Sequence, residues 1–310
     1  MNGRYTLQPT AVKNKNLRKR ADTLQEILFV APQLLLFVLF TIVPFFVAIP
    51  LVLTDRVSFL DNEVNYVGLK NFVTIFQEPF ISEFIPALKR TIRFTVLNYA
   101  SIYVFGLTLA LLMFEYKSKL KKPFFTVIYM PYMISGLGTG MLLTLLFSRD
   151  TGSLNLLLQH MGLITSPIDI KTEAAVTWLL PLTTGWRYAG MNMAFFLGGL
   201  LSIPTDSIEA SVVDGANYFQ KLRYIYIPQI IPSIVMATVT CLIGSFNLID
   251  ELFGMGAMYG NASAVFLSVL VYRKGFMGGL SQSVAMSLTV FVPLICIAFL
   301  LIRWQRSKQV

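Results

Sequence analysis

Few residues of this chain could carry charge-dependent chemistry inside its apolar segments. Arg187 lies near the middle of the apolar run 174–201, and Asp250 and Glu251 follow directly after the run 224–249. A charged side chain is costly within hydrocarbon, so it usually faces an aqueous cavity or an oppositely charged partner. Two roles stay open for Arg187: contact with a solute, which would favour an acidic sugar or a phosphate ester, or an ion pair with Asp250 or Glu251.

Polar and aromatic side chains accompany these charges in the two runs. Aromatic faces stack on sugar rings while polar groups bond to hydroxyls, so this mixture indicates a binding surface for a sugar. By residue type the candidates are Thr184, Trp186, Tyr188, Met191, Asn192, Ser245, Asn247, Asp250 and Glu251. Helix–helix packing is the competing interpretation, and it is favoured for any one of these residues taken singly.

Residue patterns for catalysis or cofactor binding are missing from the sequence. No GxxxxGK[ST] run is present to bind nucleotide phosphates, and no polar segment is long enough to hold such a domain. His160 is the only histidine, and it lacks the acidic or thiol companions of a metal site. Cys241 and Cys296 both lie in apolar runs, where inert packing is the default. We therefore expect no catalytic residues, no metal and no cofactor in this chain.

The composition is that of an integral membrane protein. Hydrophobic residues make up 55% of the chain and charged residues 13%, about half the charged share of soluble domains. Six apolar runs are long enough to cross the membrane as helices: 27–54, 94–114, 123–148, 174–201, 224–249 and 275–302. They lack the alternation of a β-barrel, so the predicted fold is all-α and polytopic, with six transmembrane helices. Gly136, Gly138 and Gly140 favour close helix packing, with a broken, pore-facing backbone as the alternative.

The distribution of lysine and arginine predicts which side of the membrane each loop faces. Most of the 25 basic residues fall in segments that share one side if six helices form: 1–26, 117–122, 221–223 and 303–308. The positive-inside rule places that side, with both termini, in the cytoplasm. The predicted organisation is a basic cytoplasmic tail at 1–26, a transmembrane domain at 27–303 and a cytoplasmic tail at 304–310. The net charge of +9 follows from this topology and does not indicate a nucleic-acid partner.

The polar stretch 203–232 has the pattern of two short helices joined by a turn. Asp206 is predicted to cap the first helix, with Glu209 three residues later able to reach back to the cap. Gly215 supplies the left-handed conformation that ends a helix, and a second helix can start at Asn217. The sequence therefore predicts a compact cytoplasmic helix-turn-helix between two apolar runs.

The stretch EASVVDGANYFQKLRYIYIP in this segment resembles the EAA loop of transmembrane subunits of binding-protein-dependent ABC importers. The matching residues are Glu209, Ala210, Asp214, Gly215, Ala216, Phe219, Ile225, Ile227 and Pro228. Ser211 stands where the family usually has alanine, a substitution that is conservative in size. The segments FVAPQLLLFVLFTIVPFFVAIPL, YVGLKNF, PFFTVIYMPYMISG and FLGGLLSIP are similar to the carbohydrate branch of that family. The resemblance covers about residues 28–304, although GMGAMYGN departs from the Gly-Gly-Pro ending common in that branch.

The resemblance implies a type I importer permease, similar to the first permease of maltose or glycerol-phosphate systems, in the plasma membrane of a bacterium or archaeon. Such a permease pairs with a second, homologous permease, with two cytoplasmic ATPase subunits that bind ATP and Mg, and with an external solute-binding protein. It forms part of the path for a sugar, an oligosaccharide or a related solute. Hydrolysis of ATP is left to the separate subunits.

The resemblance also assigns roles to residues of this chain. The loop at about 203–228 would be a coupling helix that contacts an ATPase subunit through Glu209, Ala210, Ser211, Asp214, Gly215 and Ala216. Alignment from the SIP and YIP segments places Thr184, Arg187, Tyr188, Met191, Gly244, Ser245 and Leu248 where relatives contact the solute. Together with Asn192, Asn247, Asp250 and Glu251, chosen by residue type, these make up the predicted solute path.

Two other classes of membrane protein compete with an importer. An integral-membrane enzyme would need acidic residues or histidines clustered at one membrane face, and the sequence offers only Asp250 and Glu251. An ion-coupled secondary transporter would need intramembrane carboxylates and inverted repeats, and neither is evident. Copurification of a nucleotide-binding subunit would separate the importer from both.

Overall fold

The computed structural model describes residues 27–61, 63–116, 119–258 and 260–307. The predicted basic tail at 1–26 and the last three residues, 308–310, lie outside the described residues. Within the described ranges the chain is helical, and the strand-like pairing there is limited to an isolated antiparallel bridge between Thr54 and Tyr66. The all-α prediction is therefore confirmed.

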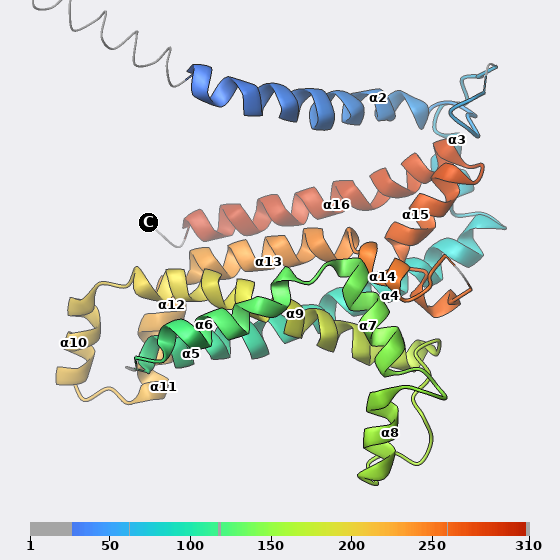
Figure 1. Cartoon of the computed structure of the whole chain (residues 1–310). Coiled ribbons are helices and arrows are strands. Elements are labelled where there is room, and N and C mark those ends of the chain that lie inside the picture. The colour runs from blue at the N-terminus through green and yellow to red at the C-terminus, as the bar shows by residue number, and fades with distance from the viewer. Residues whose placement is uncertain (1–26, 62, 117–118, 259, 308–310) are drawn as a thin grey trace, which may run out of the picture.

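The first apolar helix, Ile27–Leu51, lies along the outside of the helical bundle (Figure 1). It contains a π-helical segment, η1 (Val38–Ile42), followed by α2 (Val43–Leu51). None of its side chains is buried by the rest of the chain. Phe45 packs against Phe291 of the last helix, with 5.6 Å between the ring centroids. This helix therefore offers most of its apolar surface to lipid or to another membrane protein.

The second long helix begins earlier than the sequence predicts. After α3 (Lys70–Thr74), a continuous helix passes through α4 (Phe80–Ser101), the π-helical η2 (Ile102–Leu107) and α5 (Thr108–Glu115). Residues 80–93, which precede the predicted apolar run 94–114, form its start. Buried side chains recur every three or four residues along α4, at Phe84, Ala87, Thr91, Phe94 and Thr95. One face therefore packs on the bundle although the other face carries charges, and this packing extends the helix beyond the apolar run.

The third apolar run is bent rather than straight. α6 (Lys121–Tyr129) and the 3-10 segment η3 (Met130–Met133) end at a break. The next helix, α7 (Gly136–Leu146), is inclined by 89° to the helix before the break. Ile134 and Ser135 in the break have extended backbones, and Ser135 Oγ caps α7 by accepting from the Gly138 N–H at 3.1 Å. The next helix, α8 (Ser153–His160), lies beyond the end of α7 (Figure 1).

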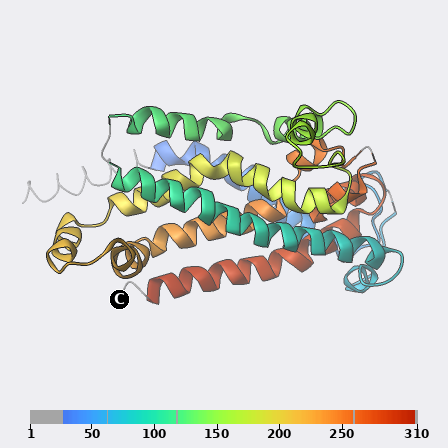
Figure 2. The same cartoon turned by 90° about the horizontal axis from the view of Figure 1, so that it is seen from below.

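The central helix of the fold is α9 (Glu173–Leu201). It lies against α4, η2, α5, α6 and α13, and Figure 2 shows it in the middle of the bundle, with α6 on one side and α16 on the other. Among the described residues, three helices are long and apolar enough to cross a membrane, or up to five if each of two bent pairs is one span. α9 is not among them, so the predicted six spans are reached only if this 29-residue, largely buried helix is included.

Residues 202–230, which we call the elbow, follow α9 and stand beyond one end of the bundle (Figure 1). The elbow consists of α10 (Thr205–Val213), α11 (Tyr218–Lys221), the π-helical η4 (Leu222–Tyr226) and α12 (Ile227–Gln229). It leads into α13 (Ile231–Phe246) through a bend of 68°. The predicted helix-turn-helix between two apolar runs is therefore present.

The last part of the chain contains two long elements and two short ones. These are α14 (Asp250–Gly254), η5 (Ala262–Ala264), α15 (Leu267–Phe276) and α16 (Leu280–Ser307). Gly278, with φ of +100°, lies in the break between α15 and α16. The last span thus begins at Leu280 instead of residue 275, because a left-handed residue interrupts the helix there. The end of α16 lies at the same end of the bundle as the elbow (Figure 1).

Candidate functional site

The first helix of the elbow begins earlier than predicted. α10 starts at Thr205 with Pro204 as its N-cap, and no side chain accepts a capping hydrogen bond. The prediction that Asp206 caps this helix and that Glu209 reaches back to the cap is therefore wrong. Pro204 has φ of −57° and ψ of 131°, so the chain already turns into the helix at the next residue. Asp206 lies in the first turn instead, where a negative charge suits the positive end of the helix.

The end of α10 is as the sequence predicts. Gly215 has φ of +73°, a left-handed conformation that glycine adopts without strain. Its N–H donates to the carbonyl of Val212 at 3.1 Å, and the N–H of Ala216 donates to the carbonyl of Ser211 at 2.9 Å. These two bonds form a Schellman motif, which satisfies the last carbonyls of the helix.

A capping box starts the second helix of the elbow at the predicted residue. Asn217 Oδ1 accepts from the Gln220 N–H at 3.0 Å, and Gln220 Oε1 accepts from the Asn217 N–H at 2.7 Å. Only Asp214, Gly215 and Ala216 separate this cap from the end of the first helix at Val213. Local hydrogen bonds therefore hold the two helices of the elbow in a defined arrangement.

The elbow presents apolar side chains at the end of the bundle. Val213 is 87% exposed, Phe219 77% and Val212 60%. Of the residues predicted to contact a partner, Glu209, Ala210, Asp214 and Gly215 are exposed, Ala216 is half-buried and Ser211 is buried. The Ser211 hydroxyl donates to the carbonyl of Ile208 at 2.6 Å, so this side chain is engaged within its own helix. Together these exposed side chains form an apolar surface on the elbow that another protein can cover.

Glu115 and Tyr226, which were not among the predicted site residues, attach the elbow to the bundle. Tyr226 is 1% exposed, and its hydroxyl donates to Glu115 Oε1 at 2.8 Å. Its ring packs edge-on against Phe114, with 5.5 Å between the centroids. The only signal in the sequence is an acidic residue at the end of an apolar run. Through these contacts the elbow is attached to α5 as well as to α9 and α13.

Arg187 of α9 is buried in an ion pair. Its Nη1 lies 2.6 Å from Glu251 Oε1 of α14, and the two side chains are 10% and 5% exposed. Nη1 also donates to the Tyr188 hydroxyl at 3.0 Å, and Nε donates to the carbonyl of Ile134 at 2.8 Å. Of the two roles left open by the sequence, the structure shows the ion pair, with Glu251 rather than Asp250 as the partner. Contact of Arg187 with a solute stays a prediction.

Glycines bring α14 against α7 beside this ion pair. A Cβ on Gly140 would collide with the backbone carbonyl of Glu251, and one on Gly254 would collide with the carbonyl of Leu137. The Thr144 hydroxyl also donates to the carbonyl of Gly254, at 3.4 Å. The close packing predicted for the glycines is confirmed at Gly140, and the alternative, a broken backbone, is present just before this helix.

The predicted path residues fall into two groups by burial. Buried within the chain are Thr184, Arg187, Asn192, Ser245, Leu248 and Glu251. Gly244, Asn247 and Asp250 are exposed, and Tyr188 and Met191 are half-buried. Thr184 donates to Asn98 Oδ1 at 3.0 Å, and Asn192 donates to the carbonyl of Tyr188 at 3.0 Å. The second group has surface to offer to a solute, whereas the first is engaged in contacts inside the chain.

These elements match a known family. The profile described as binding-protein-dependent transport system inner membrane component matches residues 102–308. The chain belongs to this family. A probable starch degradation products transport system permease protein of Thermoanaerobacterium thermosulfurigenes is 30% identical over 249 residues, which cover 80% of this chain and 82% of the relative. A lactose transport system permease protein of Rhizobium radiobacter is 28% identical over 307 residues, which cover 96% and 100%.

The fold of this inner membrane component is similar to that of solved transporter chains. One chain, from a bacterial ABC transporter involved in the import of the acidic polysaccharide alginate, has a TM-score of 0.75 and 24% identity. That match covers 95% of this chain and 99% of the other. A chain of the MetNI methionine ABC transporter has a TM-score of 0.53 and 21% identity, covering 75% and 99%. The predicted permease fold is thus confirmed.

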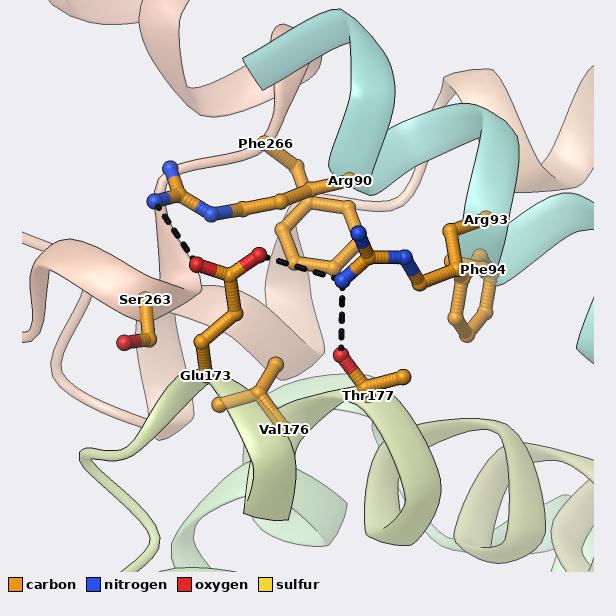
Figure 3. A pocket seen from close by; sticks show the side chains of 8 residues that line it. All are labelled: Arg90, Arg93, Phe94, Glu173, Val176, Thr177, Ser263 and Phe266. Atoms are coloured by element: carbon orange, nitrogen blue, oxygen red, sulfur yellow. Dashed lines mark hydrogen bonds and ion pairs between the residues drawn. The ribbon is translucent and has the colours of Figure 1, made fainter. Parts of the chain in front are cut away.

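At the opposite end of this inner membrane component from the elbow, charged side chains join α4 to α9. Arg93 Nη1 lies 3.1 Å from Glu173 Oε1, and Arg90 Nη2 lies 3.8 Å from Glu173 Oε2. Figure 3 shows both guanidinium groups of α4 on the one carboxylate of α9, with Ser263 nearby. The cavity that these side chains line measures about 10 Å³, which is room for a single water molecule and too small for a sugar. The described residues contain no group of three or more His, Cys, Asp or Glu that could hold a metal ion.

Proposed function

We propose that this chain is the permease subunit of an ATP-driven importer for a sugar, an oligosaccharide or a related solute. Membership of the family supports an inner membrane component of a binding-protein-dependent system. The relatives named for starch degradation products and for lactose favour a carbohydrate. The observation that carries the proposal is the elbow, which lies beyond one end of the bundle (Figure 1). Its exposed valines are accessible there to a separate ATPase subunit.

The elbow docks on a cytoplasmic ATPase subunit, which binds ATP and Mg in place of this chain. Val212 and Val213 supply the apolar contact, and the small Ala210 and Gly215 allow the partner backbone to come close. Glu209 is exposed and forms no capping bond, so its carboxylate is available to a basic residue of the partner. The Schellman motif at the end of α10 and the capping box at the start of α11 fix the junction of the two helices, so movement of the ATPase subunit displaces the elbow as one body.

The end of the bundle with the elbow faces the cytoplasm of a bacterium or archaeon, and both termini lie on that side. α16 ends there at Ser307, and its last turns carry Arg303 and Arg306 (Figure 1). Lys121 and Lys122 open α6 at the same end. Basic residues at the cytoplasmic ends of membrane helices support this orientation.

The solute passes along the surface near the two breaks at residues 134–135 and 247–249. Irregular backbone at membrane depth is tolerated where it is buried in protein or lines an aqueous cavity, and broken helices often mark a transport site. Tyr188 and Asp250 flank the ion pair of Arg187, and they are half-buried and exposed, respectively. Met191, Gly244 and Asn247 are exposed or half-buried and extend the surface available to the solute. The buried members of the predicted path keep the helices in position through contacts inside the chain.

A second, homologous permease completes the path, and an external solute-binding protein delivers the solute at the end opposite the elbow. The unburied helix Ile27–Leu51 supports such a partner. A cavity of about 810 Å³ lies between α2 and the helices α13, α15 and α16, and its lining is mainly apolar, with Phe246 and Leu288 among its residues. An apolar surface of this kind suits another transmembrane helix.

Copurification from native membranes tests the proposal. The tagged wild-type chain should bring down a nucleotide-binding subunit, and Val213→Asp should reduce the recovered amount at least about ten-fold, as expected for a charge forced into a docked apolar contact. Leu163→Asp is the matched control, because Leu163 is also exposed, at 64%, but follows α8, which lies at the other end of the bundle from the elbow (Figure 1). Undiminished recovery with Val213→Asp would contradict docking through the elbow. A wild-type chain without any nucleotide-binding subunit would contradict the importer and favour an ion-coupled transporter or a membrane enzyme.

A further inference from the structure

Arg187 connects three parts of the fold that are distant in sequence. The residue lies on α9, its Nε donates to the carbonyl of Ile134 in the break before α7, and its Nη1 pairs with Glu251 of α14. In the part of the chain that the structure describes, no other hydrogen bond or ion pair joins α9 to α14 or to that break. One guanidinium group therefore provides the directional link between these elements.

α7 and α14 form one compact piece, which we call the α7–α14 unit. The backbones meet at Gly140 and Gly254, where neither helix has space for a side chain. A Cβ on Gly136 would lie 2.7 Å from the Cβ of Asp250, so the contact extends along the start of both helices. Because backbones packed this closely have no free volume between them, the two short helices move together.

α9 leads from the ion pair to the elbow without an intervening loop. Arg187 lies about 21 Å from the end of α9 at Leu201, at 1.5 Å per residue. The chain then enters α10 at Thr205, directly after Pro204. A continuous helix of this length carries a displacement of its elbow end to Arg187.

We infer that Arg187 is a positioning residue for transport, which couples α9 to the α7–α14 unit so that displacement of the elbow moves α7 and α14 together with α9. The inference rests on the proposed function, in which a separate ATPase moves the elbow. Asn247 and Asp250 are exposed and lie just before or at the start of α14, so they shift with the unit. The link through Arg187 thus changes the surface proposed to line the solute path.

The chemistry of arginine suits a link better than it suits a stabilising contact. Desolvation of two charges offsets most of their attraction, so a buried ion pair contributes little net stability compared with apolar packing. A guanidinium group, however, donates in several fixed directions at once. Arg187 uses this property to hold the Ile134 carbonyl and the Glu251 carboxylate together. Lysine has the charge but lacks this planar fork.

The test follows the accessibility of residue 247 through the ATPase cycle. Asn247→Cys is placed in a chain whose Cys241 and Cys296 are replaced by serine, and the complex with its ATPase subunits is purified in lipid nanodiscs. A charged, water-soluble thiol reagent labels the cysteine without nucleotide and after trapping with ATP and vanadate. We expect trapping to change the labelling rate at least about ten-fold, and Arg187→Gln to reduce that change below about two-fold while the ATPase subunits stay bound.

Arg93→Gln is the matched control, because it removes an arginine–glutamate pair that joins α4 to α9 and whose side chains are both about half exposed. It should leave the nucleotide-dependent change in labelling intact. The inference is overturned if Arg187→Gln keeps the full change, or if trapping does not alter labelling in the parent chain. If the Arg187→Gln chain does not assemble with the ATPase subunits, the same labelling is measured on Arg187→Lys. This variant should also lose the nucleotide-dependent change, because lysine lacks the planar fork of arginine. Loss of the ATPase subunits in Val213→Asp concerns the proposed function instead, so the two failures are distinguishable.

Discussion

Replacing Glu251 by leucine would leave the guanidinium group of Arg187 buried without a counter-charge. The two side chains are 5% and 10% exposed and lie 2.6 Å apart. In the variant, Arg187 would keep only two neutral acceptors, the Ile134 carbonyl and the Tyr188 hydroxyl. Removing one partner of a buried ion pair costs about 3–5 kcal/mol. We therefore expect Glu251→Leu to lower the free energy of unfolding by about 3–5 kcal/mol.

The double variant Arg187→Met with Glu251→Leu separates loss of the pair from loss of packing. Replacing both charges by apolar side chains of similar volume is often neutral or stabilising, so most of the lost stability should return. The coupling energy of the cycle should then be about 3 kcal/mol. Unfolding of the purified chain by sodium dodecyl sulfate in mixed micelles, followed by circular dichroism, gives the four free energies. The same double variant, although stable, should fail the labelling experiment on residue 247.

An exposed pair between α4 and α9 supplies the reference for this cycle. Arg93 and Glu173 are 50% and 51% exposed, and such a pair contributes about 0–1 kcal/mol. Arg93→Leu should therefore leave the unfolding free energy nearly unchanged. If Glu251→Leu also costs less than about 1 kcal/mol, the pair of Arg187 is hydrated and the reasoning from burial is refuted.

Three further predictions concern the elbow and the α7–α14 unit. Gly215→Ala should destabilise the elbow by about 1 kcal/mol, because φ of +73° strains any residue with a Cβ. Less ATPase subunit should then be recovered in copurification, and recovery of the wild-type amount would contradict this. Tyr226→Phe removes the hydroxyl that donates to Glu115, and the loss of about 1–2 kcal/mol should lower the unfolding midpoint while the ATPase stays bound. Gly140→Val drives its side chain into the carbonyl of Glu251, so little folded protein should reach the membrane fraction, and wild-type amounts would show that α7 and α14 are not in contact.

The elbow shows what short-range sequence determines. Gly215 ends α10, and Asn217 begins the next helix, as predicted, because both act on backbone groups within a few residues. The start of α10 was predicted wrongly, because Pro204 sets the entry into the helix and no side-chain cap forms. The helical class and the apolar runs likewise follow from composition, because a chain in lipid must satisfy its backbone within each segment.

Where the helices break and where they begin depends on packing between distant segments. α4 starts at Phe80 because a face of that charged stretch is buried, which the apolar run beginning at residue 94 does not reveal. The bend of 89° before α7 brings its glycines against α14, more than a hundred residues away in sequence. No window of neighbouring residues contains that information.

The sequence by itself determined an all-helical membrane chain, its family and the place of the elbow. Tertiary structure alone decided that Arg187 pairs with Glu251 and not with Asp250, because adjacent helical residues point about 100° apart and only the contact with α7 orients α14. It also separated the path residues that are buried, such as Thr184 and Asn192, from those that keep a surface. Residue type reports what a side chain can bind, whereas the helices packed around it decide what it can reach.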